Sequence, residues 1–296
     1  MNFLVTGANG QLGCELRALA PLYPQHRFSF ATRAELDITD AVGVSRMVQQ
    51  SRAQAIINCA AYTQVDRAEA DAAQAEAINH FGAAHLAQAA KRADALLVHI
   101  STDYVFGGRG NTPFTEQDSP APLGVYGHTK LAGELAVRAS GCRHLILRTS
   151  WLYSSYGSNF VKTIRRLIAE RQELKVVSDQ VGSPTYAADL AAAILHILSQ
   201  PPAAALRGTY HYSNEGVCSW YDFAVAIHRL SRASSPCRIL PCRSREFPSN
   251  VQRPSFSVLD KAAIRRAFAL PIPHWLSSLE RCIHKLETDP KMTNEK

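Results

Sequence analysis

The sequence predicts an α/β fold in which helices cover both faces of a doubly wound parallel sheet, followed by a smaller C-terminal region. In the first half, short and almost fully apolar segments alternate with longer stretches that are compatible with helices. Apolar segments of this kind are typical of parallel strands that are buried on both faces. After about residue 151 prolines interrupt the pattern, so we expect shorter and less regular elements there.

The expected elements follow from hydrophobic periodicity. Residues 2–6 form an apolar run that ends in glycine, and residues 11–20 carry Leu12, Leu16 and Leu19 at helical spacing. The further strand candidates are residues 27–31, 55–59, 96–101 and 144–149, and the helix candidates that accompany them are residues 42–50, 71–92 and 129–139. Residues 156–170 and 187–198 are the helix candidates of the second half.

Composition limits the class of protein. Of the 296 residues, 46% are hydrophobic and 19% are charged, which is enough apolar material for a large core and excludes a disordered chain. We expect no membrane partner, because no uninterrupted apolar stretch is long enough to span a bilayer. The seven cysteines are scattered without a C-x-x-C pair, and Met1 leads directly into the first strand without an export signal, so we expect reduced thiols and a cytoplasmic location.

The net charge of +7 comes entirely from the second half of the chain. Residues 1–150 hold 13 basic and 13 acidic side chains, whereas residues 151–296 hold 19 basic and 12 acidic ones. Residues 229–266 are especially rich in arginine. Such a surface could receive a phosphorylated ligand or a nucleic acid, or it could be a solvated basic face that only aids solubility.

A glycine-rich turn joins the first strand to the first helix. Gly7, Gly10 and Gly13 follow a G-x-x-G-x-x-G spacing, so the backbone can turn tightly and approach a ligand closely. The free amide groups at the start of the helix would then bind the pyrophosphate of a dinucleotide. The alternative is a purely structural turn.

About 20 residues after such a turn, one side chain usually contacts the adenosine ribose of the cofactor. This position falls at Arg33, and an arginine there favours the 2′-phosphate of NADP(H). Glu35 and Asp37 are close enough in sequence to leave NAD(H) open. The alternative for Arg33 is an ordinary surface position.

Candidate catalytic residues are Tyr126, Lys130 and a hydroxyl at the end of the fourth strand. Tyr126 and Lys130 are four residues apart, so on a helix they face the same way. The lysine charge would then lower the pKa of the phenol toward the working range of an acid–base catalyst. The hydroxyl of Thr102 or Ser101 could donate to a substrate carbonyl oxygen, although each could equally cap a turn.

Several segments together resemble one known superfamily. They are the glycine turn, residues 58–63 with Val65 and Asp66, residues 101–106, residues 125–127 with 130–134, residues 148–151, residues 179–185 and residues 253–255. Their combination resembles the extended short-chain dehydrogenase/reductases, and within them the dTDP-4-dehydrorhamnose reductase family. The resemblance covers nearly the whole chain. It implies a Rossmann-like dinucleotide-binding domain at residues 1–152. Residues 153–296 would be mainly a substrate-binding domain, with some helices returning to pack on the first sheet.

The resemblance also implies an activity, the NAD(P)H-dependent reduction of the C4 ketone of dTDP-4-dehydro-L-rhamnose to dTDP-L-rhamnose, a precursor of surface polysaccharide. Tyr126 would donate the proton, Lys130 would lower the pKa of Tyr126 and hold the nicotinamide ribose, and Thr102 would bind the ketone oxygen. The cofactor-binding positions would be Gly7, Gly10, Gln11, Leu12, Arg33, Asp37, Ile38, Ala60, Ala61, Tyr62, Tyr126 and Lys130. The substrate-binding positions would be Thr102, Asp103, Trp151 and Arg253.

The sequence disfavours three other functions. Related 4,6-dehydratases place a glutamate after the Thr-Asp pair, where this chain has Tyr104, so dehydration is disfavoured. An epimerase uses the same tyrosine and lysine and is disfavoured by the C-terminal resemblance. A non-catalytic, dinucleotide-binding regulatory subunit is disfavoured by the intact Thr102, Tyr126 and Lys130.

The expected cofactor is NADPH, with NADH open, and the expected partner is a dTDP-sugar rather than a nucleic acid. Some members of the family dimerise through a divalent metal bound by glutamates. Glu15 matches one such position, but residues 186–189 lack a second glutamate, so we assign no metal ligands. A magnesium requirement and a homodimer stay open.

Overall fold

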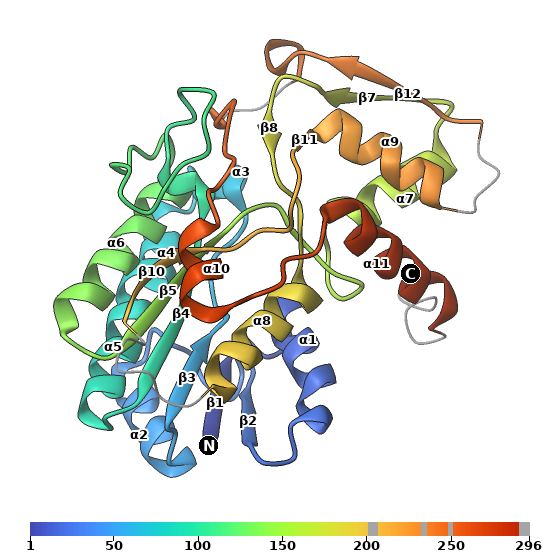
Figure 1. Ribbon diagram of the computed structural model, residues 1–296. Coiled ribbons are helices and arrows are strands. Elements are labelled where there is room, and N and C mark those ends of the chain that lie inside the picture. The colour runs from blue at the N-terminus through green and yellow to red at the C-terminus, as the bar shows by residue number, and fades with distance from the viewer. Residues whose placement is uncertain (201–206, 232–235, 248–250, 290–296) are drawn as a thin grey trace.

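The computed structural model describes residues 1–200, 207–231, 236–247 and 251–289. Its centre is a six-stranded sheet with the strand order β10-β5-β4-β3-β1-β2 (Figure 1). All neighbouring strands in it run parallel. They are β1 (Asn2–Thr6), β2 (Arg27–Ala31), β3 (Ala55–Asn58), β4 (Leu96–Thr102), β5 (His144–Thr149) and β10 (Gly208–His211). The predicted α/β fold with a parallel sheet is confirmed.

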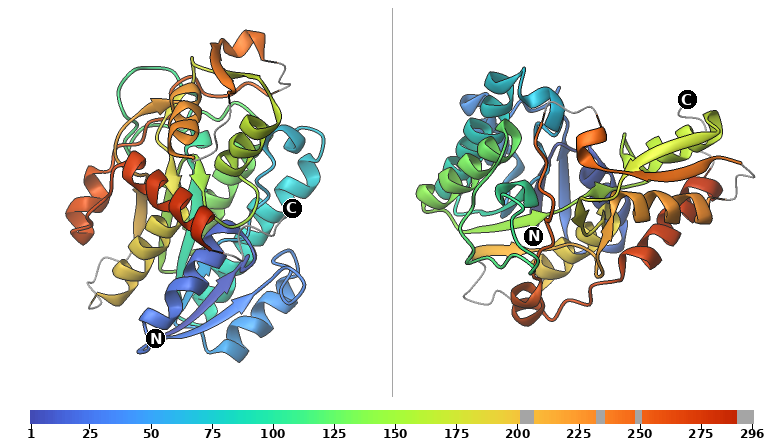
Figure 2. Two further views of the ribbon diagram at one scale, coloured as in Figure 1. Left: turned by 90° about the vertical axis from the view of Figure 1, so that its right-hand side faces the viewer. Right: turned by 90° about the horizontal axis from the view of Figure 1, so that it is seen from above.

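Helices cover both faces of this sheet (Figure 2). Along β1 the side chains alternate, so that Phe3 and Val5 pack into one core and Leu4 packs into the other. The first core lies against α1 (Gln11–Leu19) and α8 (Ala187–Ser199). The second core lies against α2 (Ala41–Ser51), α5 (Ala83–Arg92) and α6 (Val125–Ser140). Burial on both faces explains why β1, β3, β4 and β5 are mostly apolar without alternation, whereas the edge strand β2 alternates.

The strand order creates a crevice at the carboxyl ends of β1 and β3. From β1 the chain first crosses to β2 on one side, and it then returns to β3 on the other side. Open α/β sheets bind ligands where the strand order reverses in this way. The turns that follow β1 and β3 meet there, so this edge of the sheet is the expected position of a site.

A second group of elements lies beyond this edge of the sheet, toward the upper right in Figure 1. Its own hydrophobic core contains Tyr153, Phe223 and Trp275. The elements are β6 (Leu152–Tyr153), α7 (Phe160–Glu170), β7 (Glu173–Val177), β8 (Val181–Gly182), β9 (Thr185–Tyr186), β11 (Cys218–Ser219), α9 (Trp220–Leu230), β12 (Arg238–Cys242) and α11 (Trp275–Thr288). They form two-stranded pairs, β12 with β7, β11 with β8 and β6 with β9. The division into two domains stays a prediction.

Short elements connect these layers. They are η1 (Ala20–Leu22), α3 (Val65–Ala68), α4 (Ala72–Glu76), the π-helical η2 (Ala77–Gly82), η3 (Asp103–Val105), η4 (Ser244–Glu246) and α10 (Ala262–Phe268). Among the described residues no helix is both long enough and apolar enough to cross a bilayer.

Several elements differ from the sequence prediction, among them α7, which begins at Phe160 and not at residue 156. The helix expected at residues 71–92 is divided into α4, η2 and α5, because the π-helical turn shifts its hydrogen-bond pattern. The helix α6 begins at Val125, four residues earlier than expected, so Tyr126 lies in its first turn. The strand β10 comes from the second half of the chain and pairs with β5 at the edge of the first sheet.

Candidate functional site

A cavity of about 530 Å³ opens at the carboxyl edge of the sheet. It lies between the turns after β1 and β3, the end of β4, the start of α6 and the loop before α7. Its lining residues are Gly10, Gln11, Leu12, Asn58, Cys59, Ala60, Ala61, Thr63, Val65, Ile100, Ser101, Thr102, Asp103, Tyr104, Tyr126, Lys130, Thr149, Ser150, Trp151, Leu152, Gly157, Ser158, Asn159, Phe160, Trp220 and Arg253.

The glycine turn forms one wall of this cavity. Gly7 has a φ of +63°, and a Cβ placed on it would lie 2.6 Å from the backbone nitrogen of Ala60. The turn after β1 therefore packs directly on the turn after β3, which only glycine permits. Gly10 caps α1 without a side chain, so the first amide groups of the helix face outward from the turn. This arrangement fits the pyrophosphate of a dinucleotide.

We expect Gly7→Ala to weaken NADPH binding at least tenfold, because the two turns must separate to admit the methyl group. Dissociation constants measured by fluorescence titration would check this. Gly141→Ala is the matched control: Gly141 has a φ of +72°, but its nearest neighbour is the flexible Nζ of Lys91 at 3.4 Å. Gly141→Ala introduces a backbone strain similar to that of Gly7→Ala and should keep the wild-type affinity for NADPH. Unchanged NADPH affinity in Gly7→Ala would contradict the role given to this turn.

The three candidate catalytic residues come together at the end of β4. Lys130 is almost fully buried, and its Nζ donates a hydrogen bond of 2.6 Å to the carbonyl oxygen of Ile100. Thr102 ends β4, and its Oγ1 donates to Oδ1 of Asp103 at 3.1 Å. Tyr126 is beside Thr102, whose hydroxyl interacts with the phenol. The sequence prediction that these groups converge is therefore met in the geometry, whereas their catalytic roles stay predictions.

The pKa values at this site differ from the sequence prediction. Burial raises the pKa of Tyr126 to about 12, and the Thr102 hydroxyl opposes this rise. Burial lowers the pKa of Lys130 to about 8, although the carboxylate of Glu134 opposes the change. Desolvation dominates both groups, so the net shift of the Tyr126 pKa is upward, and the lowering of that pKa by Lys130 stays a prediction. Tyr126 consequently holds its proton throughout the neutral range.

Asp103 is a buried carboxyl group next to these residues. Burial raises its pKa to about 7, although hydrogen bonds from the Thr102 and Ser257 side chains and from backbone amides oppose this shift. Its Oδ2 is buried and finds no hydrogen-bond partner among the described residues. A buried acceptor without a partner is unusual. A ligand hydroxyl that donates a hydrogen bond to Oδ2 of Asp103 would satisfy this acceptor.

Two tryptophans close the far side of the cavity. Trp151 has a φ of +48°, which is rare for a residue other than glycine, and its ring stacks on Trp220 with centroids 3.6 Å apart. A second cavity of about 920 Å³ adjoins the first, and the two share Phe160, Trp220 and Arg253. Arg253 forms an ion pair with Asp66, in which Nη2 donates to both carboxylate oxygens, at 2.6 and 2.8 Å. Its Nε is buried without a partner among the described residues.

Several predicted positions lie in the cavity and others lie outside it. Those in the cavity are Gly10, Gln11, Leu12, Ala60, Ala61, Thr102, Asp103, Tyr126, Lys130, Trp151 and Arg253. Gly7 and Ile38 lie outside the cavity. Gly7 packs against the turn after β3, and the side chain of Ile38 packs against Gly82. Tyr62 donates from Oη to Asp71, and Asp37 accepts from Thr39. Arg33 lies just after β2 with 75% of its side chain exposed, and its Nε is 4.0 Å from Asp37.

Several cavity residues of the second half of the chain were not predicted from the sequence, which gave only Trp151 and Arg253 there. Asn159 caps α7 by accepting from the amide of Lys162, and the preceding residues Gly157 and Ser158 line the site. The pattern Gly-Ser-Asn before an apolar helix was a usable cap signal. Trp220 gave no local signal, because only tertiary folding brings it onto Trp151.

Glu15 does not fit a metal site here. It is almost fully buried, and its Oε1 accepts a hydrogen bond of 2.6 Å from Ser154. Its Oε2 is 3.2 Å from the Nζ of Lys285, so an ammonium group already supplies the positive charge. Within the described part of the chain, no three His, Cys, Asp or Glu side chains gather as metal ligands.

Comparison with known proteins identifies the family. The sequence model of the family described as RmlD substrate binding domain matches residues 1–288. A dTDP-4-dehydrorhamnose reductase of Escherichia coli (strain K12) is 40% identical, with 97% of this chain and 99% of the relative covered. One of Burkholderia thailandensis is 39% identical, with the same shares covered.

A solved structure of the reductase from Bacillus anthracis in complex with NADP is also similar. It has a TM-score of 0.90 and 42% identity, and 96% of this chain and 98% of that chain are covered. A dTDP-glucose 4,6-dehydratase from Streptomyces venezuelae, at 21% identity and a TM-score of 0.80, shares the fold alone. The resemblance predicted from the motifs is confirmed, and the chain belongs to the RmlD substrate binding domain family.

Proposed function

We propose that this chain reduces the C4 ketone of dTDP-4-dehydro-L-rhamnose to dTDP-L-rhamnose with NADPH. The observation that carries the proposal is the convergence of Thr102, Tyr126 and Lys130 in one buried cluster beside the glycine turn. Full-length relatives near 40% identity are named for this activity. The names of the relatives therefore indicate the substrate. The geometry of this chain indicates the residues that would act on it.

Each residue of the cluster has a separate role in the proposed reduction. When bound, NADPH supplies a hydride to the ketone carbon. The phenol of Tyr126 donates its proton to the ketone oxygen as that oxygen gains negative charge, and its raised pKa keeps the proton available until then. The hydroxyl of Thr102 gives up its bond to Asp103 and donates a second hydrogen bond to the same oxygen. The ammonium of Lys130, below Tyr126 on the same helix face, stabilises the negative charge left on the phenolate.

The nucleotide part of the substrate has room in the second cavity. That cavity is lined by Lys175, Arg245 and Arg253 as well as by apolar side chains of α7. Basic side chains suit a diphosphate, since charge-assisted hydrogen bonds to it are strong. We assign Arg253 as one diphosphate contact, because its Nε is buried and unsatisfied within the described chain. The stacked Trp151 and Trp220 lie between the two spaces and would contact the sugar.

The exposed Arg33 supports a preference for NADPH over NADH. We expect Arg33→Ala to raise KM for NADPH about tenfold and to leave KM for NADH unchanged, because one charge-assisted contact to the 2′-phosphate is lost. Initial rates with both cofactors measure this. Arg143→Ala, at the opposite end of the sheet, is the control and should change neither value. Equal changes for NADPH and NADH would contradict the assignment.

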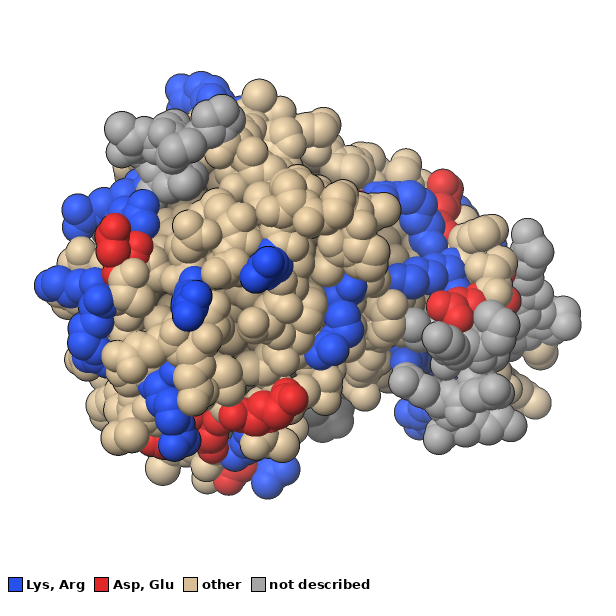
Figure 3. Space-filling view, turned by 90° about the horizontal axis from the view of Figure 1, so that it is seen from below, with Lys and Arg blue, Asp and Glu red and all other residues tan. Residues whose placement is uncertain are grey.

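On one face of the molecule, the charged side chains do not form a surface suited to a nucleic acid. On the face in Figure 3, lysine and arginine stand at separate points over the surface, and acidic side chains lie among them. Nucleic-acid binding needs a basic stripe or patch that follows the phosphate backbone. The scattered charges of this face do not form one.

The test of the proposed function is turnover. Purified protein with NADPH and dTDP-4-dehydro-L-rhamnose should show loss of absorbance at the reduced-nicotinamide band and should form dTDP-L-rhamnose. Tight NADPH binding without turnover would contradict the proposal and indicate a regulatory subunit. Conversion of the keto-sugar to an isomer without net NADPH consumption would contradict it as well and indicate an epimerase.

A further inference from the structure

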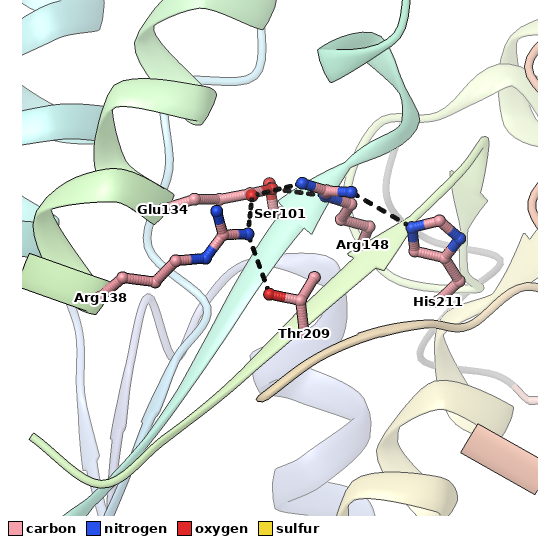
Figure 4. Close-up of polar contacts among 6 residues, drawn as sticks. All are labelled: Ser101, Glu134, Arg138, Arg148, Thr209 and His211. Carbon is pink, nitrogen blue, oxygen red and sulfur yellow. Dashed lines mark hydrogen bonds and ion pairs between the residues drawn. The ribbon is translucent and has the colours of Figure 1, made fainter. Parts of the chain in front are cut away.

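Figure 4 shows a buried ion pair between α6 and β5. Its carboxylate, Glu134, lies one helical turn from Lys130 of the catalytic cluster. Glu134 on α6 is fully buried, and Arg148 on β5 is 1% exposed. The guanidinium binds the carboxylate in a bidentate manner, with Nε donating to Oε1 at 2.9 Å and Nη2 donating to Oε2 at 2.8 Å. Arg138, one turn further along α6, adds a bond of 3.0 Å to Oε2. Two cations therefore face one carboxylate.

The pair is enclosed by side chains from two strands. Ser101 on β4 donates from Oγ to Oε1 of Glu134 at 2.6 Å. His211 on β10 places its Nε2 3.4 Å from Nη1 of Arg148, and Thr209 accepts a bond of 3.0 Å from Arg138. The sticks in Figure 4 show these groups converging from one helix and three strands.

Glu134 continues a line of functional residues on α6. Tyr126, Lys130 and Glu134 are spaced by four, so they lie on one face of the helix. They contact consecutive residues at the end of β4. Lys130 bonds the carbonyl of Ile100, Glu134 accepts from Ser101, and Tyr126 lies beside Thr102. The hydrogen bonds made by Lys130 and Glu134 fix the position of α6 along β4. The catalytic geometry depends on this register.

We propose that Glu134, clamped by Arg148, is a positioning residue that holds α6 in register with β4 and keeps Lys130 as an ammonium beside Tyr126. This inference rests on the proposed reductase function. Stability alone does not explain the pair, because well-packed apolar residues usually replace a buried ion pair without loss. A fixed negative charge one helical turn from a buried lysine has a direct use, since burial disfavours the charged amine and the carboxylate favours it.

Other charged or titratable groups lie on the elements packed against this part of α6. They are Tyr126, His128 and Arg138 on α6, Asp66 and Arg67 on α3, Glu76 on α4, His80 on η2, His85, Lys91 and Arg92 on α5, His99 on β4, Asp103 and Tyr104 on η3, His144 and Arg148 on β5, and His211 on β10. Burial lowers the pKa of His99 and of His211, so both are neutral near pH 8. Burial raises the pKa of Tyr104 and of Tyr126, so both phenols are neutral as well. Asp103, whose pKa burial raises to about 7, and Lys130, whose pKa burial lowers to about 8, are then the two groups expected to titrate here, and only the ionisation of Lys130 should shift in opposite directions in the two ion-pair variants.

The experiment compares two variants that break the same ion pair with opposite changes in charge. In the wild type, kcat/KM should fall as the pH rises through about 8, when Lys130 loses its proton. Glu134→Gln removes a negative charge, so the midpoint of this fall should move down by about one pH unit. Arg148→Gln removes a positive charge, so its midpoint should stay or move up. A shift in the same direction in both variants, or in neither, would overturn the proposal.

A second variant keeps the test valid if Glu134→Gln fails to fold. Ser101→Ala leaves the ion pair intact and removes only the link from Glu134 to β4, so we expect kcat to fall about fivefold with an unchanged pH midpoint. Ser140→Ala is the matched control on α6, since Ser140 bonds only within its own helix end, to Val137 and Cys142. An unchanged kcat in Ser101→Ala would contradict the positioning role.

The pH dependence of NADPH binding separates this inference from the proposed function. A wild-type chain without keto-sugar turnover would contradict the reductase activity alone. The dissociation constant of NADPH, measured between pH 6 and pH 10 in the wild type and both ion-pair variants, would still report the ionisation of Lys130. The same opposite shifts are expected there, and their absence would overturn the role of Glu134.

Discussion

Tyr126→Phe should reduce kcat about 10²- to 10⁴-fold, the range that a positioned general acid contributes. The variant removes only the hydroxyl, so the ring still packs edge-on against Tyr104, with centroids 5.6 Å apart. NADPH affinity should therefore change little, and the loss should be confined to the chemical step. Steady-state rates with the keto-sugar and a separate NADPH titration measure the two quantities.

Tyr210→Phe provides the control for this prediction. Tyr210 lies on β10 and packs edge-on against Phe268, away from the cavity, so its phenol is not expected to take part in the reaction. The control should retain the wild-type rate. A Tyr126→Phe variant that also retains the wild-type rate would show that another group donates the proton.

Asp103→Asn should stabilise the protein at pH 8. The pKa of Asp103 is about 7 in the folded chain, and its usual value is 3.8. Because the folded-state pKa is raised, the contribution of protonated Asp103 is complete below about pH 4 and is lost as the pH rises through 7. At pH 8 the ionised form costs up to about 4 kcal/mol, from about 1.4 kcal/mol per pKa unit. Asparagine has nearly the same shape as aspartate but does not ionise, so the variant avoids this cost.

The measurement is urea unfolding of both proteins at pH 5 and pH 8. The difference in unfolding free energy between variant and wild type should be large at pH 8 and small at pH 5, because other titrating groups cancel in the difference. An equal difference at the two pH values would contradict a raised pKa for Asp103. We also expect the variant to lose turnover, since Asp103 bonds Thr102. Such an exchange of stability for activity is typical of active sites.

Local patterns in the sequence predicted the parts of the site that short segments determine. The glycine spacing after β1 and the four-residue spacing of Tyr126 and Lys130 each specify a backbone geometry within one turn, and the structure has both. The central strands were also predictable, because their burial on two faces leaves a nearly uninterrupted apolar signature. These features need no knowledge of distant contacts.

The features that were missed depend on tertiary contacts. Nothing near Gly208 marks β10 as a sixth strand, since a four-residue edge strand gains its stability from β5. The spacing of Tyr126 and Lys130 indicated a shared face but not the degree of burial, and burial sets their pKa values. Glu134 and Arg148 are 14 residues apart and pair only because α6 packs on the sheet.

A crystal structure of the chain with NADPH and dTDP-L-rhamnose would test the central claim most directly. We expect the nicotinamide in the first cavity, its C4 within about 4 Å of C4 of the sugar, and the phenolic oxygen of Tyr126 about 2.6–3.2 Å from the C4 oxygen. A nicotinamide bound outside that cavity, or a sugar oxygen out of reach of both Tyr126 and Thr102, would contradict the account.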